Sequence, residues 1–514
     1  MLAAAAVVAT PARAETTFGV ADDRPKYAAD GGASFFATMR DLGLTSVRVT
    51  LQWDSENPRA ISERADLERM VVQARRYGIE VVVALYPTRA KALSERPTAP
   101  AEFAAWAADV ARAFPSVRRF VVGNELNQPR FHQPQFLPDC TRASGAAYMD
   151  VLVRTYDLMK AIDPGITLIT SVSSRGNDSC RAQSNVSTSP YRFIHDMGLA
   201  YRALGRTRPA WDEWGLHAYP NSPSDPLSRG FPWPNIGLPN LARLKQALWD
   251  AFAGTGQPTF GATYTPGHAL AAMLQPKIYI GETGWQTRVP ASSRQAYYGE
   301  ETVQATTDEF QAETYSQIVR TSSCDPAVST VMFLMLVDEP DLARMQTGLV
   351  RADGTRRPSF AAVKRAIADT GGRCSRRPAN WKPTKSVVGA NVRWGRLRQQ
   401  WWKQRWWGFN VTAGEEATYR AGIFRLPGRS VTERRRVAIT RALVGIGTQR
   451  PVHAATGQIT AYWSPLVRFP ERRLRPGWYA YAVRVTATMN PARASTLTSR
   501  PFRVFKPRPR RRGH

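Results

Sequence analysis

Two glutamates stand where a protein could perform acid–base or nucleophilic chemistry, because each directly follows a short apolar run. Glu125 ends the run RFVVGNE (119–125), and Glu282 ends KIYIGE (277–282). A carboxylate beside a buried strand carries a desolvation cost unless it is paired or used. A salt bridge at the rim of a fold would explain one such residue as well as function does, but two of them favour a catalytic pair.

Three polar residues on other apolar runs fit supporting roles. In SVRVTLQW (46–53), Arg48 shares the inward parity of alternate residues, from which it could keep Glu282 ionised. In WGLHAYP (214–220), His217 and Tyr219 alternate to one face. The structural alternatives are a hydrogen-bonded core histidine at 217 and a structural ion pair at 48.

The elements that must position these residues alternate regularly between residues 17 and 371. Continuous apolar runs, typical of strands buried on both faces, alternate with amphipathic helical stretches such as 63–78, 99–114, 145–162 and 358–368. Eight such units predict an α/β fold, a (β/α)8 TIM barrel over residues 15–375. A doubly wound sheet is the alternative, but no Gly-rich phosphate loop follows the first run. The expected strands are 17–22, 46–53, 80–87, 119–125, 166–172, 214–220, 277–283 and 330–337.

The predicted barrel decides how the four cysteines pair. Cys140 and Cys180 follow the fourth and fifth strands and belong to the active face, whereas Cys324 precedes the eighth strand and Cys374 follows the last helix. A disulfide cannot span the height of a barrel, because its Cα atoms must lie within about 7 Å. We therefore predict Cys140–Cys180 and Cys324–Cys374.

The two glutamates, with their neighbours and their strands, carry a family resemblance. Asn124-Glu125 after the fourth strand and Glu282 after the seventh resemble the retaining barrel glycoside hydrolases of the 4/7 superfamily (clan A), over about residues 17–371. Gly-Asn-Glu (123–125) and Glu-Thr-Gly-Trp (282–285) are similar to family 17, and His-Ala-Tyr-Pro (217–220) to families 5 and 39.

The resemblance implies a role for each residue of the candidate site. Glu282 would be the nucleophile, and Glu125 would be the general acid and then the base, about 5–5.5 Å apart as retention requires. Asn124 would bind the sugar 2-hydroxyl, and Tyr219 would donate a hydrogen bond to the nucleophile. The site implied is that of a retaining glycoside hydrolase acting by double displacement.

Aromatic and acidic residues at the strand ends are candidates for sugar binding. We expect Trp53 and Trp285, which end the second and seventh strands, to be exposed stacking surfaces. The eighth strand lacks the tryptophan that such barrels often place under the reacting sugar. Asp338, Glu339 and Asp341 cluster at its end instead, either to bind hydroxyl groups or to solvate a loop.

The ends of the chain differ from the barrel in composition. Residues 1–14 contain an apolar run and a small-x-small site, which predict an export signal peptide. Residues 376–514 carry 30 Lys/Arg against 4 Asp/Glu, whereas the rest carry 40 against 37. The formal charge of +29 is therefore concentrated in the C-terminal part, whose partner must differ from that of the barrel.

The C-terminal part shows β-type alternation after a Pro- and Lys-bearing linker (376–390). We expect a basic immunoglobulin-like β-sandwich over 391–506 and a disordered tail over 507–514. The run LRPGWYAYAVRVTAT (474–488) resembles a tyrosine corner, with Tyr479 or Tyr481 as the corner residue. Eight of the fifteen tryptophans lie here, among them those of WWKQRWW (401–407). Aromatics interleaved with cations suit an anionic cell-wall polymer or acidic polysaccharide, although the same residues would also furnish a sandwich core and its outer faces.

These observations converge on a secreted, extracellular or cell-wall-associated enzyme acting on a polysaccharide or oligosaccharide. No run reaches the roughly 18 apolar residues of a membrane span, and we expect no nucleic-acid partner, no metal and no cofactor. The alternative is a non-catalytic carbohydrate-binding or wall-attachment protein on a barrel scaffold. In a non-catalytic protein, the presence of both glutamates would have no chemical reason.

Overall fold

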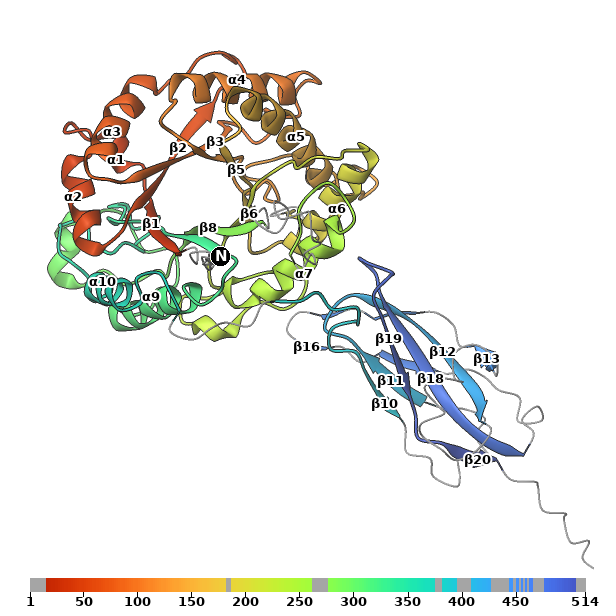
Figure 1. Ribbon diagram of the computed structural model, residues 1–514. Helices are drawn as coiled ribbons and strands as arrows, with labels where there is room; N and C mark the ends of the chain where they lie inside the picture. Colours follow the sequence, from red (N-terminus) through yellow and green to blue (C-terminus); the bar gives the residue numbers. More distant parts are fainter. Residues whose placement is uncertain are drawn as a thin grey trace, which may run out of the picture. The chain divides into compact units, whose positions relative to one another are not determined.

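The computed structural model divides the chain into two compact units (Figure 1). It describes residues 15–181, 186–260, 276–374, 381–394, 408–426, 443–446, 450–452, 454–455, 458–459, 462–465 and 476–504. The first unit runs to Gly230 and resumes over Asn235–Lys382; the second groups Phe231–Pro234 with the chain from Pro383 on. The expected signal peptide and C-terminal tail lie outside the described residues.

The first unit is a closed barrel of eight parallel strands, as predicted. Strands that are hydrogen-bonded neighbours in the sheet run parallel to each other. The first strand, β1, also pairs with the last, β9, and β5 pairs with β7 to complete the ring (Figure 1). This closure excludes the open doubly wound sheet. The strands are β1 (Thr17–Ala21), β2 (Ser46–Trp53), β3 (Glu80–Pro87), β4 (Arg119–Val122), β5 (Thr167–Ile169) with its continuation β6 (Val172–Ser173), β7 (Glu213–His217), β8 (Lys277–Thr283) and β9 (Val328–Phe333).

Amphipathic helices surround the barrel and bury one face against it (Figure 1). A glycine ends α2, where Gly43 adopts φ 82° and closes the last turn. The helices are α1 (Arg24–Tyr27), α2 (Ala33–Leu42), α3 (Arg64–Arg76), α4 (Ala99–Ala113), α5 (Ser144–Ile162), α6 (Pro190–Ala203), α7 (Leu241–Phe252), α9 (Asp308–Ser322) and α10 (Pro358–Thr370), with 3-10 turns η1 (Leu227–Arg229), η2 (Leu238–Asn240) and η3 (Ala291–Ala296). Within the described ranges, no helix has both the length and the apolar character needed to cross a bilayer.

Side chains from most of the strands form a cluster within the barrel. The strands are buried on both faces, which explains why their sequences are continuous apolar runs rather than alternating ones. The barrel is thus a packed scaffold with its chemistry at one end. The cluster consists of Ala21, Val82, Ala84, Val121, Ile169, Tyr279 and Met332.

Two disulfides form as predicted, one at each end of the barrel. Cys140 is bonded to Cys180, with Cα atoms 5.5 Å apart, and Cys324 to Cys374, with Cα atoms 4.5 Å apart. The first joins the loops that follow β4 and β6. The second ties the chain just after α10 to the turn that precedes β9.

The second unit contains antiparallel sheets. The largest joins β13 (Leu443–Ile446), β12 (Ala417–Leu426), β18 (Gly477–Ala487) and β19 (Ala494–Thr498), with β14 (Arg450–Val452) and β20 (Phe502–Val504) at its sides. A second sheet joins β10 (Asn391–Trp394), β11 (Gly408–Thr412) and β17 (Tyr462–Pro465), and a third pairs β15 (Ala454–Ala455) with β16 (Gln458–Ile459). The β-sandwich remains a prediction.

Buried residues on one face of β12 and β18 form the core of this unit. Tyr419 and Val483 belong to it, together with Val411 of β11. Tyr479 is buried, whereas the side chain of Tyr481 and the run 401–407 lie outside the described part of the chain.

Candidate active site

Glu125 lies in a sharp turn directly after β4. The strand ends at Val122, three residues earlier than expected, because Gly123 adopts φ 80° and Glu125 itself φ 43°. Non-glycine residues rarely occupy this left-handed region, and such strain concentrates at functional sites. The backbone N–H of Glu125 donates to Ser171 Oγ at 3.1 Å, so the loop after β5 holds the turn in place.

Glu282 lies near the end of β8 and has two strong hydrogen-bond donors. Arg48 donates to Oε1 at 2.7 Å, and the Tyr219 hydroxyl donates to Oε2 at 2.6 Å. Burial raises the pKa of Glu282, but the charges of His217 and Arg48, with these two hydrogen bonds, lower it by more. The net pKa lies below the ordinary value of a glutamate, so this carboxylate is held ionised.

His217, the last residue of β7, lies between the two carboxylates. Its Nδ1 is 2.9 Å from Glu125 Oε1 and 3.5 Å from Glu282 Oε2, and its Nε2 is 3.3 Å from Ser171 Oγ. The ring is 1% exposed and has polar partners on both nitrogens. It is therefore a hydrogen-bonded buried histidine whose partners include both members of the pair.

Arg48 links Glu282 to Asn124. Besides its contact with the carboxylate, its second guanidinium nitrogen donates to Asn124 Oδ1 at 2.9 Å. Burial alone would lower the pKa of Arg48, but the charge of Glu282 raises it above the ordinary value. A planar guanidinium orients both partners from two nitrogens in a fixed geometry, whereas a lysine offers only one nitrogen on a flexible stem.

Glu125, His217 and Glu282 bring one polar side-chain atom each close together. These atoms lie within 4.8 Å of one another, which is also a spacing that three metal ligands can adopt. The guanidinium of Arg48 contacts Glu282 and already supplies the compensating positive charge there. The arrangement therefore suits acid–base and nucleophilic chemistry better than a divalent cation.

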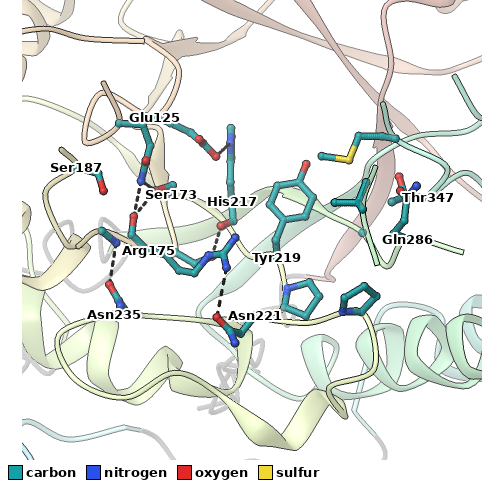
Figure 2. A pocket seen from close by; sticks show the side chains of 18 of the residues that line it. Glu125, Ser173, Arg175, Ser187, His217, Tyr219, Asn221, Asn235, Gln286 and Thr347 are labelled. Atoms are coloured by element: carbon teal, nitrogen blue, oxygen red, sulfur yellow. Dashed lines mark hydrogen bonds and ion pairs between the residues drawn. The ribbon is translucent and has the colours of Figure 1, made fainter. Parts of the chain in front are cut away.

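Two cavities open at this end of the barrel. The larger has a volume of about 730 Å³, and the residues lining it include Glu125, His217 and Tyr219. The second, of about 480 Å³, is lined among others by Glu282 and Arg48. Figure 2 shows Ser173 and Arg175 on one side of the larger cavity and Gln286 and Thr347 on the other, with His217 and Tyr219 between them.

The two tryptophans expected at the rim are not stacking surfaces. Trp53 is fully buried, packs edge-on against Phe103 and donates to a backbone carbonyl at 3.2 Å. Trp285 is 2% exposed, packs edge-on against Tyr315 and likewise donates to a backbone carbonyl at 3.2 Å. Neither lines a cavity of the site. Their strand-end positions are as predicted, but both indoles are enclosed, Trp53 beside Phe103 and Trp285 beside Tyr315. Trp214 is also buried.

The acidic cluster after β9 divides into a structural and an accessible part. Asp338 is fully buried, ion-paired with Arg357, and accepts a hydrogen bond from Tyr297 at 2.7 Å. Glu339 and Asp341 line the Glu282 cavity. The cluster therefore contributes two carboxylates to the site and uses the third to hold the loop.

Ser171 is a site residue that sequence reasoning missed. Its hydroxyl contacts both the Glu125 backbone and the His217 ring, as described above. A serine within the fifth apolar run, ITLITSV, was the available signal, since a hydroxyl there needs a partner. The apolar run predicts one strand over 166–172, whereas β5 ends at Ile169 and Ser171 lies before β6.

No protein-family model and no curated protein sequence matches this chain. Among solved structures, its neighbours are glycoside hydrolases of families 39 and 5 and related enzymes. A family 39 glycoside hydrolase from Bacteroides cellulosilyticus WH2 is 16% identical (TM-score 0.47), covering 82% of this chain and 74% of that one. A monomeric β-xylosidase from Caulobacter crescentus CB15 is 13% identical (TM-score 0.44; 88% and 94%). GH5_18 from Streptomyces cattleya, in complex with GlcNAc, is 17% identical (TM-score 0.44; 73% and 84%).

Proposed function

We propose that the protein is a retaining glycoside hydrolase that cleaves O-glycosidic bonds of a polysaccharide or oligosaccharide. The observation that carries this proposal is a pair of carboxylates, just after β4 and near the end of β8, with one oxygen of each within 4.8 Å of the other. Retaining enzymes place their carboxyl groups about 5–5.5 Å apart, whereas inverting enzymes leave about 6.5–9.5 Å for a water molecule. The close approach of these two oxygens supports the retaining arrangement.

The environments of the two carboxylates divide the roles between them. Glu282 is held ionised by Arg48 and Tyr219, which suits attack on the anomeric carbon. As its oxygen bonds to that carbon, the bond to the leaving oxygen breaks, and Glu125 donates a proton to that oxygen. Glu125 then removes a proton from water, which attacks the same carbon and releases Glu282 as a carboxylate.

The supporting residues act through these two groups. Arg48 and Tyr219 position Glu282 and share its negative charge, which disappears into the glycosyl ester and returns when the ester is hydrolysed. Asn124, oriented by Arg48, is placed to bind the sugar 2-hydroxyl. His217 contacts both carboxylates, so we assign it to positioning Glu125 beside Glu282.

Replacing each carboxylate by its amide tests this assignment. Glu282→Gln should abolish turnover while the protein stays folded, and Glu125→Gln should slow substrates with poor leaving groups by about 10²–10⁴-fold and activated aryl glycosides much less. A matched control is Glu80→Gln, which changes a glutamate at the opposite end of the barrel, paired with Arg119. NMR of the first-formed product should show retained anomeric configuration. Inversion would overturn the mechanism; a folded wild-type protein that binds saccharides but cleaves none would favour the non-catalytic alternative.

The proposed function includes a cellular location and a binding role for the C-terminal unit. We propose that residues 1–14 direct export, which the two disulfides support because they persist in oxidising compartments. We further propose that residues 391–506 form a basic β-sandwich that binds an anionic cell-wall polymer. Its high positive charge and the antiparallel sheets of the second unit support this assignment.

A further inference from the structure

The catalytic pair has open space on both sides. Glu125 lines the cavity of about 730 Å³, and Glu282 lines the one of about 480 Å³. Because one oxygen of each carboxylate lies within 4.8 Å of the other, the two cavities approach each other at the pair. Both volumes fall within the roughly 300–1,000 Å³ of small-molecule sites, so each side can hold part of a substrate.

The proposed chemistry gives each cavity a direction along a saccharide chain. The proton donor acts on the leaving oxygen, so the leaving part of the chain departs on the side of Glu125. The part that becomes bonded to Glu282 remains on the other side. The Glu282 cavity is thus the glycone side, and the Glu125 cavity is the aglycone side.

Exposed apolar side chains line both cavities. Among the described residues, the large hydrophobic side chains classed as exposed include two aromatic ones, Tyr27 (58%) and Tyr298 (62%). Both line the Glu282 cavity. Val303 and Met345, also exposed, line the Glu125 cavity. An exposed aromatic ring in a cavity offers the apolar C–H face of a sugar a surface that excludes water.

The two tyrosines are held in place by their surroundings. The Tyr27 hydroxyl donates to Glu63, and the ammonium of Lys26 lies 4.7 Å from the ring centroid. The backbone of Tyr298 is fixed on both sides, since its N–H donates to Pro340 and its carbonyl accepts from Leu342, each at 3.0 Å. The Tyr27 ring is therefore held before any ligand binds, and Tyr298 is anchored through its backbone, so both are available to replace the buried tryptophans as stacking surfaces.

The charges of the Glu282 cavity disfavour an acidic sugar. Five carboxylates line it against three guanidinium groups. Each guanidinium is already near a carboxylate: Arg48 at 2.7 Å, Arg24 at 3.4 Å and Arg344 at 3.5 Å. No excess positive charge remains for a uronate, whereas carboxylate oxygens are good acceptors for hydroxyl groups. The carboxylates are those of Asp22, Asp23, Glu282, Glu339 and Asp341.

The Glu125 cavity is lined mainly by uncharged hydrogen-bonding groups. Its acidic and basic lining residues are Glu125, Arg175 and His217, and Arg175 lies 3.4 Å from the Asn221 amide oxygen (Figure 2). Amide side chains both donate and accept, as hydroxyl groups do, so they suit neutral sugar rings. They are Gln128, Asn177, Asn221, Asn235, Gln286 and Gln304.

We infer that the enzyme cleaves within chains of a neutral saccharide, with the chain bound on both sides of the pair and with Tyr298 and Tyr27 as the stacking surfaces of the glycone side. The inference rests on the proposed function and adds the substrate class and the mode of cleavage. It also separates the substrate from the anionic polymer proposed for the C-terminal unit.

Chain-length dependence and product patterns test the inference. The probes are end-labelled hexasaccharides of β-1,4-linked xylose, glucose and mannose, with an oligogalacturonate hexamer as the anionic counterpart. We expect the first products of the preferred neutral hexamer to be fragments of two to four units, formed by cleavage of internal bonds. In Tyr298→Ala and Tyr27→Ala, the ratio of kcat/KM for that hexamer to kcat/KM for its aryl monoglycoside should fall about tenfold, with rescue by Phe.

A matched control and a binding measurement complete the test. Leu199→Ala removes a comparably exposed side chain (55%) from α6, which lines neither cavity, and should leave the ratio unchanged. Calorimetric titration of the Glu282→Gln full chain with the same hexamers should give about tenfold weaker binding after Tyr298→Ala.

Three results would overturn the inference. They are release of terminal monosaccharide alone, an unchanged ratio in both alanine variants, and faster cleavage of the anionic hexamer than of every neutral one. Absence of any hydrolysis would refute the proposed function and the internal cleavage with it. The titration would still decide whether the tyrosines hold a neutral chain.

Discussion

At the scale of single residues, the ionisation of Glu282 decides the chemistry. Burial favours its neutral form, and the charges of His217 and Arg48 reverse that preference. The Arg48 contact of 2.7 Å is direct, and both side chains are largely withdrawn from water, so screening by salt is weak. The nucleophile is therefore kept charged by its neighbours rather than by solvent.

Removing Arg48 should shift the acid limb of the pH–activity profile. A nucleophile must be ionised, so activity falls as pH drops through its pKa; with Arg48 present that pKa lies below the ordinary 4.5. Arg48→Gln removes the charge and should move the acid limb of kcat/KM to higher pH by about one to two units. The measurement is kcat/KM against pH from 3 to 8.

Two further variants make this result specific. Arg48→Lys keeps a charge but loses the simultaneous contact with Asn124, so it should restore the pH limb more than the rate. Arg119→Gln removes a buried guanidinium paired with Glu80 and Glu213 at the opposite end of the barrel. It should leave the limb in place. An acid limb that is the same in wild type and Arg48→Gln would show that Arg48 does not set the charge of Glu282.

Residue parity along strands allowed much of the site to be predicted. Arg48, His217 and Tyr219 were placed inward by alternation alone, and the structure brings all three to the two glutamates. The solvent exposure of a side chain at a strand end could not be predicted in the same way. Whether Trp53 is a surface or a core residue depends on which loop covers it, and loop packing leaves no periodic signal.

At the scale of elements, the turn after β4 is the part of the barrel most directly tied to catalysis. Within three residues, this turn leads from the end of a buried strand to a carboxylate that faces the site. Gly123 makes this possible, because at φ 80° a side chain would be strained and its Cβ would lie 2.3 Å from Leu126 Cδ1.

Gly123→Ala should therefore impair both stability and turnover. A residue with a Cβ costs about 1–2 kcal/mol in the left-handed region, and the clash with Leu126 adds to it. Relaxation of the turn would displace Glu125, so kcat should fall at least tenfold even where the variant remains folded. Thermal unfolding and kcat on a poor leaving group are the measurements.

Gly205→Ala is the matched control. Gly205 also has a positive φ, 59°, but no atom lies within 4 Å of the added Cβ, and it follows α6 away from the site. It should lower the melting temperature slightly and leave kcat intact. If the two variants lose equal stability and neither loses activity, the turn does not position Glu125.

The elements themselves were predictable because their sequence patterns are strong and alternate regularly: continuous apolar runs for the strands and amphipathic stretches for the helices. Buried parallel strands appear as continuous apolar runs, and the barrel topology then paired all four cysteines correctly. The strand ends at the site were less predictable. There the chain leaves extended geometry early, at Gly123 after β4 and after Ile169 in β5, to bring polar groups inward.

At the scale of the whole molecule, charge separates the two units. The described face of β12 and β18 places Arg420 directly opposite Arg484, and both side chains are exposed. Like charges facing each other across strands are unfavourable unless an anion lies between or near them. This pair gives the proposed polymer-binding role a defined position on the sheet.

Removal of the second unit should abolish adhesion without abolishing catalysis. The truncation is best made after Lys382, since Trp381 packs edge-on against Phe260 within the first unit. Hydrolysis of small soluble substrates should persist, while retention on cell walls or acidic polysaccharide at low salt should be lost. Retention of the full chain should weaken steeply as the Debye length falls from about 10 Å at 0.1 M to about 3 Å at 1 M salt.

A point variant tests the same surface in the intact protein. Arg420→Gln with Arg484→Gln should shift the salt concentration that releases the full chain to a lower value. Equal retention of full-length, truncated and doubly substituted proteins at every salt concentration would refute the binding role. The charge asymmetry was evident from the sequence, but the Arg420–Arg484 register was not, because pairing depends on strands far apart in the chain.

Covalent trapping of the nucleophile tests the central claim most directly. An activated 2-deoxy-2-fluoro glycoside of the preferred sugar should react with a retaining enzyme to form a slowly hydrolysed glycosyl ester on the nucleophile. The fluorine destabilises both transition states, while the good leaving group lets the first step proceed. Intact-protein mass spectrometry should show one added glycosyl group, and peptide mapping should place it on Glu282. The Glu282→Gln variant should show no added mass. Label on another residue, or none on an enzyme that hydrolyses the parent glycoside, would contradict the assignment of Glu282 as the nucleophile.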